Sequence, residues 1–335
     1  MERAFVNFGR PVLGLAAFGA FVATQAMAAD LEEANLRLAF TAGGVDAPVF
    51  MAACKGYYED AGIDLEIVDG NGSTGTIQAV GNGSFNIGIA GLGALAQASA
   101  MSGFDNITAV AGLVQKDPSS IIALKGSGIT EPKDIEGKRF ATEAGNLSDG
   151  MITAFAEAND IDMDTVEIVV TDAYMQALLK GDADFINAWA NPDGDHVKEF
   201  AEIEEPMLFA DHGVNILGSS IIVRKDYLAE NEDLVRGLVE AVLKGYEDVQ
   251  ADPEAALECF MEQRPDADPE GIAREIEVME KYRHTNRSED MPFGYLNDED
   301  IVQTISLLEQ YSGMPTGEVT PDSIYTDASL PPLSQ

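Results

Sequence analysis

The residues whose types and spacing could do chemistry gather in five short loops, each between an apolar run and a helical pattern. The first loop, Thr41–Val49 (TAGGVDAPV), turns at Gly43 and Gly44 and places Asp46 just before Pro48. Asp46 is suited to capping the helix that Pro48 begins, and equally to presenting a carboxylate to a ligand. The residues of this loop leave both roles open.

Two more glycine-rich loops follow the next apolar runs. Asp69–Thr76 (DGNGSTGT) carries hydroxyl groups at Ser73 and Thr74 before a helix, where free backbone N–H groups favour an anion or a carbonyl oxygen. No Gly-Lys-Ser/Thr follows, so the loop is not a P-loop, and a turn with a helix cap is the alternative. Ala90–Ala94 (AGLGA) allows close backbone approach at Gly91, either by a ligand or between helix and strand.

The last two loops carry polar side chains and the single tryptophan. Thr142–Asp149 (TEAGNLSD) has donors and acceptors at Asn146 and Ser148, where a helix begins. Asn187–Asp193 (NAWANPD) contains Trp189, the only tryptophan of the chain. Trp189 is either a core residue or a flat wall for a ring or a methylammonium group.

From these loops, the adjoining strand ends and the chain crossings we predict a set of ligand-binding residues. The set is Phe40, Gly44, Asp46, Asn71, Ser73, Thr74, Gly91, Gln115, Thr142, Asn146, Ser148, Asn187, Trp189 and Asn215. Catalytic and metal patterns are absent from the sequence. The three histidines show no HExxH and no Cys/His zinc spacing, and there is no GxSxG. We therefore predict no catalytic residue, no metal, no cofactor and no enzymatic activity.

The elements that position these loops form a repeated βα pattern, which is typical of sheets covered by helices. We expect an α/β protein of two lobes, each a mostly parallel sheet flanked by helices, with the ligand at the carboxyl ends of the strands in a cleft at a hinge. The expected lobes are residues 29–116 with 222–335, and residues 117–221. The expected strands are Leu36–Ala42, Asp64–Val68, Phe85–Ala90, Thr108–Val114, Ser119–Leu124, Arg139–Glu143, Val166–Val170, Asp184–Trp189 and Ser219–Arg224.

The expected helices include four in a row near the C-terminal end of the chain. The main ones are Val49–Ala61, Gly75–Asn82, Leu92–Ser102, Ser148–Asn159, Ala173–Lys180, Asn231–Asp252, Pro253–Gln263, Asp268–Tyr282 and Asp298–Gln310. The two cysteines, Cys54 and Cys259, both fall in helical patterns. They form either a disulfide or two buried thiols, because sequence alone does not bring two side chains within bonding distance.

The N-terminal residues and the net charge of the chain predict where the protein is located and which partners it avoids. Arg3 and Arg10 precede an apolar run, and Ala26-Met27-Ala28 is a small-x-small site, so residues 1–28 are predicted to be a cleaved signal peptide. We expect export to the periplasm. The formal net charge is −38, with 58 Asp and Glu against 20 Lys and Arg. Such a surface repels nucleic acid and anionic membranes and is suited to high salt, although a need for salt in folding stays open.

The loops together resemble a known family of solute-binding proteins, those that serve nitrate, sulfonate, taurine and thiamine-pyrimidine ABC importers. The likeness lies in Asp46-Ala47-Pro48, Gly56-Tyr57-Tyr58 and Gly62-Ile63-Asp64-Leu65, then in GNGSTGTIQAVGNGSFNIGIAG, VQKDPSSIIALKGSGITEPKDIEGKRFAT and MQALLKGDADFINAW. It runs through nearly all of the chain after the signal peptide. The resemblance implies a type II periplasmic binding protein of two α/β lobes that closes on a ligand and docks on a membrane permease.

Asp46 departs from the histidine that is commoner in the resembled family, and a carboxylate there suits an amine or an aminopyrimidine better than a bare anion. We therefore expect a monomeric binding protein for a nitrogenous heterocycle or small organic amine, with Trp189 stacking on the ring. Sulfonate, taurine or nitrate binding through Ser73 and Thr74 is the alternative. A periplasmic ligand sensor and a pyrimidine-synthesis enzyme on the same fold are the competing classes, and the export signal argues against the enzyme.

Overall fold

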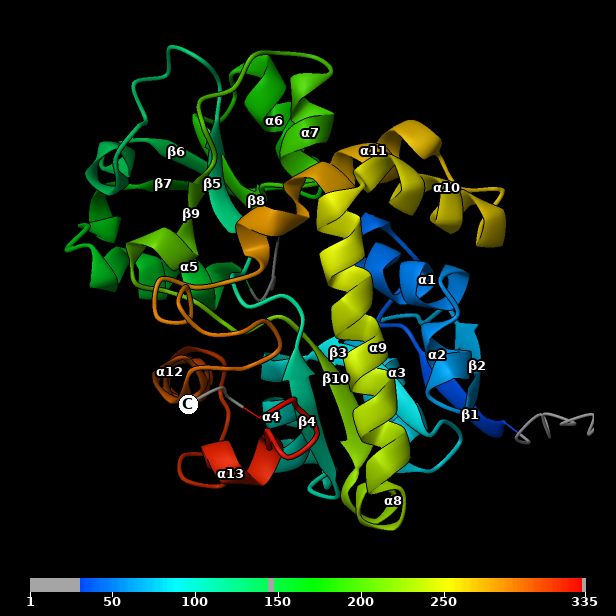
Figure 1. Cartoon of the computed structure of the whole chain (residues 1–335). Coiled ribbons are helices and arrows are strands. Elements are labelled where there is room, and N and C mark those ends of the chain that lie inside the picture. Colours follow the sequence, from blue (N-terminus) through cyan, green and yellow to red (C-terminus); the bar gives the residue numbers. More distant parts are fainter. Residues whose placement is uncertain (1–30, 144–147, 333–335) are drawn as a thin grey trace, which may run out of the picture. The chain divides into compact units, whose positions relative to one another are not determined.

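A computed structural model describes residues 31–143 and 148–332 of the 335-residue chain. The predicted signal peptide and Asn146 lie outside the described residues. The described residues form two sheets flanked by helices, shown in Figure 1.

The first sheet holds β1 (Glu32–Arg37), β2 (Ile63–Val68), β3 (Ile87–Gly91), β4 (Ile107–Gly112) and β10 (Ser219–Arg224) in the order β2-β1-β3-β10-β4. The strands β1, β2 and β3 are parallel, with Leu36 opposite Ile67 and Ile87. β10 is antiparallel to both of its neighbours, β3 and β4. We call this sheet and its helices the first lobe.

The second sheet has the same design and defines the second lobe. It holds β5 (Ser119–Ala123), β6 (Arg139–Thr142), β7 (Glu167–Val170), β8 (Phe185–Trp189) and β9 (Met207–Leu208) in the order β7-β6-β8-β5-β9. Here β6, β7 and β8 are parallel, and β5 is antiparallel to β8 and β9.

The two-lobed α/β fold expected from the sequence is confirmed, with one difference in the sheets. Each sheet is mixed rather than mostly parallel, because a strand next to a chain crossing, β5 or β10, runs against its neighbours. The two crossings lie side by side, since the Leu113 N–H donates to the Ser219 carbonyl at 2.7 Å and the Gly218 N–H donates to the Val114 carbonyl at 3.0 Å. Such paired crossings are typical of a hinge between lobes.

Helices follow the predicted pattern with local breaks. The expected helix Val49–Ala61 is divided at Gly56, whose φ of +73° ends one helix and begins the next. The α-helices are α1 (Ala47–Cys54), α2 (Tyr57–Asp60), α3 (Ser73–Gly81), α4 (Leu92–Ser102), α5 (Ser148–Ala158), α6 (Tyr174–Lys180), α7 (Asp193–Lys198), α8 (Lys225–Glu230), α9 (Glu232–Ala251), α10 (Pro253–Gln263), α11 (Pro269–Val278), α12 (Asp298–Tyr311) and α13 (Pro321–Ile324). The 3-10 helices are η1 (Gly44–Asp46), η2 (Pro132–Ile135), η3 (Met163–Thr165), η4 (Phe209–His212) and η5 (Met279–Tyr282).

The core of the first lobe joins distant segments. α1, α9 and α10 pack on one face of the sheet through buried residues that include Phe50, Val242 and Phe260. A Cβ atom at Gly245 of α9 would lie 2.1 Å from the Pro48 carbonyl oxygen, so the two helix backbones are nearly in contact. Cys54 of α1 and Cys259 of α10 form a disulfide, with their Cα atoms 5.9 Å apart, which answers the question that the sequence left open.

α12 contributes to the cores of both lobes. Its Ile301, Ile305 and Leu308 pack with α4 in the first lobe. On the other side Leu307 and Tyr311 pack against the core of the second lobe. The hydroxyl of Tyr311 also donates a hydrogen bond of 2.6 Å to the carboxylate of Glu157 in α5. The lobes are therefore held together through this helix as well as through the crossings.

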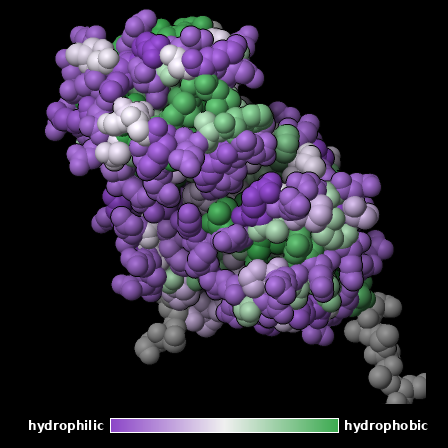
Figure 2. Space-filling model, turned by 90° about the horizontal axis from the view of Figure 1, so that it is seen from above, coloured by the Kyte–Doolittle hydropathy of each residue, from purple (hydrophilic) through white to green (hydrophobic). Residues whose placement is uncertain are grey.

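The surface seen from above in Figure 2 is mostly hydrophilic. Figure 2 shows a face on which hydrophilic residues predominate and hydrophobic patches are confined to small areas. Within the part of the chain that the structure describes, no helix has the length and apolar character needed to span a membrane.

Candidate functional site

The carboxyl ends of the parallel strands carry an exposed aromatic side chain on each lobe. Phe40 follows β1 of the first lobe and is 64% exposed, and Trp189 ends β8 of the second lobe and is 54% exposed. The Trp189 N–H donates to the Asp193 carboxylate at 3.0 Å, which links the strand end to the start of α7. Phe200 is equally exposed, at 65%, so what distinguishes Phe40 and Trp189 is their place at strand ends. An exposed aromatic ring in such a place is able to stack on a flat ligand.

Asp46 lies half-buried in η1, directly after the loop that follows β1. One of its oxygens accepts the Gly43 N–H at 3.0 Å within η1, whereas its side chain makes no capping hydrogen bond to α1, the helix that the sequence suggested as its capping partner. Burial raises the pKa of Asp46 from its ordinary value of 3.8 to about 7, and the nearby carboxylates of Glu275 and Asp69 act in the same direction. The Gly43 hydrogen bond and the cation of Arg264 oppose this rise.

Glu275 is a site residue that the sequence analysis missed. It comes from α11, and its carboxylate accepts the backbone N–H of Gly44, the residue next to Gly43. The two partners are 231 positions apart in the chain, and no local motif marks Glu275. Arg264 supplies a positive charge that acts on Asp46. It is bound to Asp69 at 3.2 Å, and its guanidinium lies 4.7 Å from the ring centre of Phe50.

Hydrogen bonds to neighbouring strands hold the predicted glycine-rich loops in place. Asn71 accepts a hydrogen bond of 3.1 Å from Arg37 at the end of β1. Ser73, the first residue of α3, accepts the Gly91 N–H at 3.1 Å, which joins the ends of two strands. Thr74 is exposed at the same helix start. Asn71, Ser73 and Thr74 follow the carboxyl end of β2, and Gly91 is the last residue of β3.

Two of the predicted ligand residues hold the hinge. Asn215 accepts the Asp117 N–H and donates to the Gln115 carbonyl, both at 2.8 Å, so it bridges the two crossings. Gln115 is fully buried and donates to the Tyr295 carbonyl at 2.9 Å. Both side chains have protein partners in this structure, so their prediction as direct ligand contacts is untested.

The remaining predicted residues belong to the second lobe. Asn187 in β8 donates to the Ser120 carbonyl at 3.1 Å, and Thr142 is buried at the end of β6. Ser148 begins α5, but its side chain, like the whole of Asn146, lies outside what the structure describes. The sequence analysis did not identify Tyr282 of η5, whose hydroxyl donates to Asn191 after β8 at 2.6 Å.

Tyr282 ties three parts of the molecule together. Its carbonyl accepts the N–H groups of Gln115 and Lys116 at 2.9 and 3.0 Å, and its hydroxyl reaches Asn191 of the second lobe. Burial raises the pKa of its hydroxyl to about 12. The segment from α11 to η5 is therefore bound to η1 through Glu275, to the hinge, and to the second lobe.

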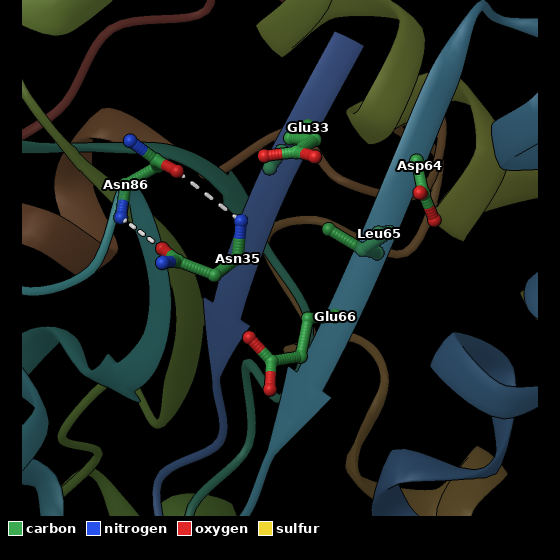
Figure 3. A pocket seen from close by; sticks show the side chains of 7 residues that line it. Glu33, Asn35, Asp64, Leu65, Glu66 and Asn86 are labelled. Atoms are coloured by element: carbon green, nitrogen blue, oxygen red, sulfur yellow. Dashed lines mark hydrogen bonds between the residues drawn. The ribbon is translucent and has the colours of Figure 1, made fainter. Parts of the chain in front are cut away.

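Two hollows in the described surface lie away from the exposed rings of Phe40 and Trp189. One, of about 320 Å³, is an acidic depression over β1 and β2, where Glu33, Asp64 and Glu66 surround Asn35 and Asn86 (Figure 3). The two asparagines bond each other's backbone N–H, at 3.2 and 2.6 Å. This hollow lies along the strands rather than at their carboxyl ends. A second hollow of about 250 Å³ lies at the hinge, beside the ion pair of Lys116 and Asp211.

Metal binding finds no support in the described side chains. Within residues 31–143 and 148–332, no group of three or more His, Cys, Asp or Glu side chains is placed to hold a metal ion. The strand ends of the two lobes carry the exposed rings of Phe40 and Trp189 and the half-buried carboxyl group of Asp46.

Known proteins resemble this chain over much of its length. The model of a family described as NMT1/THI5 like matches residues 45–256, more than half of the chain. A 4-amino-5-hydroxymethyl-2-methylpyrimidine phosphate synthase of Aspergillus parasiticus is 23% identical over 236 residues, 65% of this chain and 67% of the relative. A formylaminopyrimidine-binding protein of Halalkalibacterium halodurans is 21% identical over 304 residues, 88% of this chain and 89% of the relative.

The fold matches solved structures. The periplasmic aliphatic sulphonate binding protein SsuA from Escherichia coli superposes with a TM-score of 0.68 at 15% identity, covering 90% of this chain and 99% of that protein. At this identity the likeness shows the fold alone. Together with the family match, it confirms the resemblance and the fold class that we inferred from the sequence.

The prediction that the chain has no enzymatic activity was wrong. Relatives that align over about two thirds of the chain are named as synthases, so enzymes occur among the relatives of this fold. The physical reason is that a cleft of this kind serves binding and catalysis alike, and the difference lies in a few side chains that motif searches do not detect. The export signal, which we used against an enzyme, lies in residues that the structure does not describe.

Proposed function

The chain belongs to the NMT1/THI5-like family, and on that premise we propose that it binds a flat, nitrogen-containing ring, of the aminopyrimidine class, between its two lobes. The fold shared with a periplasmic binding protein supports a mechanism in which the lobes close on the ligand. The closed protein would then deliver the ligand to an ABC permease at the membrane, after export of the chain to the periplasm.

The single observation that carries this proposal is the pair of exposed rings, Phe40 and Trp189. Each stands at a strand end of a different lobe and is more than half exposed. A ligand that buried one of these rings would gain about 1.5–3 kcal/mol from it, so two exposed rings offer a favourable surface for a planar ligand. A planar ligand held between the lobes would cover both at once.

Asp46 supports the nitrogen-containing part of the ligand. A carboxyl group with a pKa of about 7 is present in both protonation states near neutrality. It is therefore able to accept an amino N–H and to donate a proton to a ring nitrogen, which is the hydrogen-bonding pattern of an aminopyrimidine. The name of the formylaminopyrimidine-binding relative, which aligns with most of this chain, points to the same chemistry.

The test is a titration with 4-amino-5-hydroxymethyl-2-methylpyrimidine, followed by the fluorescence of the single tryptophan and by thermal unfolding. A ligand present at 100 times its Kd should add about 2.7 kcal/mol to the unfolding free energy. Taurine, nitrate and betaine are the competing probes. A response to taurine or nitrate alone, with none to the pyrimidine, would contradict the proposed ligand class.

Matched variants connect the response to the site. Phe40→Ala and Trp189→Ala should each weaken pyrimidine binding at least tenfold, with the Trp189 variant read by thermal unfolding. Phe200→Ala is the control, because Phe200 is equally exposed at 65% but follows α7 rather than a strand end. Equal losses in all three variants would show that the rings at the strand ends have no special role.

A second candidate function, synthesis of a pyrimidine phosphate, is favoured by the names of the relatives that align over about two thirds of the chain. The two candidates differ in what happens to the bound molecule. If the protein only binds, the pyrimidine recovered after a long incubation has an unchanged mass. A change in mass that depends on the protein would establish turnover.

A further inference from the structure

We propose that Tyr282 is a positioning residue for Trp189, because its hydroxyl group holds the loop of the second lobe that carries the tryptophan ring. We call this loop, residues 189–193 between β8 and α7, the Trp189 loop. The inference rests on the proposed function, because it concerns how the site presents one of its two exposed rings to a ligand.

Tyr282 is fixed to the first lobe. It is the last residue of a helical rod in which η5 follows α11 without a gap. Ile272 and Met279 of this rod are buried in the core of the first lobe. The Tyr282 carbonyl oxygen accepts the N–H groups of Gln115 and Lys116, in the crossing that follows β4. Tyr282 is also only 6% exposed, so the first lobe and the crossing together set where its hydroxyl group lies.

The hydroxyl group of Tyr282 reaches the second lobe. It donates a hydrogen bond of 2.6 Å to the side-chain oxygen of Asn191, which is 91 positions away in the chain. The side-chain nitrogen of Asn191 donates to the carboxylate of Asp195 in α7. A hydroxyl donor on one side and a carboxylate acceptor on the other hold the amide in one orientation. Removal of the hydroxyl group would therefore release one side of Asn191.

Trp189 depends on this contact because little else restrains its ring. The indole side chain belongs to a residue that is 54% exposed, so packing fixes it only in part. The Trp189 N–H donates to Asp193, which belongs to the same loop and moves with it. The Ala190 N–H donates to the Pro118 carbonyl at 2.8 Å, which ties the loop to a crossing. The bond from Tyr282 adds the tie to the first lobe.

The surroundings of Tyr282 keep its hydroxyl group protonated. Burial raises the pKa of this group to about 12, and the carboxylates of Asp195, Glu205 and Asp117 act in the same direction. The hydroxyl group is therefore available as a donor to Asn191 throughout the neutral pH range.

The rod that ends at Tyr282 contacts both walls of the proposed site. Glu275, in its α11 part, accepts the Gly44 N–H in the turn after Phe40. Tyr282, at its end, holds the Trp189 loop. The rod therefore relates the position of one exposed ring to that of the other. A ligand that stacks on rings held in this way loses less conformational freedom on binding, and so binds more tightly.

The experiment uses Trp189 as its own reporter, since the chain has a single tryptophan. Time-resolved fluorescence anisotropy, excited where tyrosine does not absorb, measures the local motion of the ring without any ligand. Tyr282→Phe removes the hydroxyl group and keeps the buried ring. Tyr311→Phe is the matched control, because the Tyr311 hydroxyl group also donates to the second lobe, to Glu157 at 2.6 Å, and lies outside the Trp189 loop.

We expect a larger amplitude of the fast, local anisotropy decay in Tyr282→Phe than in the wild type, and no change in Tyr311→Phe. Asn191→Ala should also increase this amplitude. Adding Tyr282→Phe to Asn191→Ala should produce no further increase, because the bond is already absent. An unchanged decay in Tyr282→Phe, or an equal change in Tyr311→Phe, would overturn the inference.

Ligand binding is measured separately by calorimetry. We expect Tyr282→Phe to bind 4-amino-5-hydroxymethyl-2-methylpyrimidine about three- to tenfold more weakly than the wild type, which is the worth of one hydrogen bond, and Tyr311→Phe to bind it equally well. Unchanged affinity in a Tyr282→Phe protein with a mobile Trp189 would disprove the link to binding. A wild type that binds no pyrimidine would remove the proposed ligand, whereas the anisotropy would still decide whether Tyr282 positions Trp189.

Discussion

Replacing Asp46 by asparagine should make the protein more stable at alkaline pH than the wild type. The carboxyl group is half-buried, accepts the Gly43 N–H, and has a pKa of about 7 against an ordinary value of 3.8. Because the folded-state pKa is above the unfolded value, the folded protein binds the extra proton. The wild type therefore loses stability as pH rises from about 4 to about 7, and the full loss is present above pH 7.

The size of the effect follows from the same values. The difference between 3.8 and about 7 corresponds to about 4 kcal/mol of unfolding free energy, at about 1.4 kcal/mol for each pH unit. Asparagine has nearly the shape of the neutral carboxyl group, keeps an oxygen for the Gly43 N–H, and does not ionise. Between pH 5 and pH 8.5 the advantage of Asp46→Asn over the wild type should grow by about 3 kcal/mol, since only the part above pH 5 is sampled.

The assay is equilibrium chemical denaturation of both proteins at the two pH values, in one fixed salt concentration. Asp60→Asn is the control, because Asp60 is exposed at the end of α2 and its replacement removes the same charge. The difference between Asp46→Asn and the wild type should depend on pH, and the difference for the control should not. A constant or shrinking advantage of Asp46→Asn would refute the reasoning that Asp46 is held partly out of water beside other carboxylates.

Two further predictions concern the architecture that holds the site. Replacing both Cys54 and Cys259 by serine should lower the unfolding free energy by about 2–4 kcal/mol, because the bridge closes a long loop with a sequence separation of 205. A thiol reductant should lower the wild type to the level of the variant, and equal stability of oxidised and reduced wild type would disprove the bridge. Gly245→Ala should cost about 1–3 kcal/mol, because the added Cβ would lie 2.1 Å from the Pro48 carbonyl oxygen. Gly194→Ala, whose nearest contact would be an ordinary 3.5 Å, should be tolerated, so equal melting temperatures would contradict the close crossing of α1 and α9.

The order and type of the elements could be predicted from the sequence, because they depend on local chemistry. Period-two and period-3.6 patterns, together with glycine at turns, are properties of neighbouring residues. α4 and α10 begin and end at the expected residues, and so does β10. The errors are local as well. The strand predicted at Leu36–Ala42 lies at Glu32–Arg37, because the apolar residues after it continue into the loop that carries Phe40.

The direction of the strands next to the crossings was not predictable in this way. β5 and β10 have the same apolar composition as their parallel neighbours. Their antiparallel pairing depends on the path of the chain between the lobes, which pairs Leu113 with Ser219 and Gly218 with Val114. Hydropathy reports burial, and burial is the same in either direction.

The sequence by itself determined the family, the two-lobed fold and the loops that lie at the strand ends, since each follows from residues close together in the chain. Only the tertiary structure decided which distant residues contact those loops. The disulfide of Cys54 with Cys259, and the carboxylate of Glu275 on the Gly44 N–H, join residues more than 200 positions apart. The pKa of Asp46 near 7 arises from that same assembly. The sequence gives the type of each residue directly. The burial of a residue and the charges around it depend on how distant segments pack together.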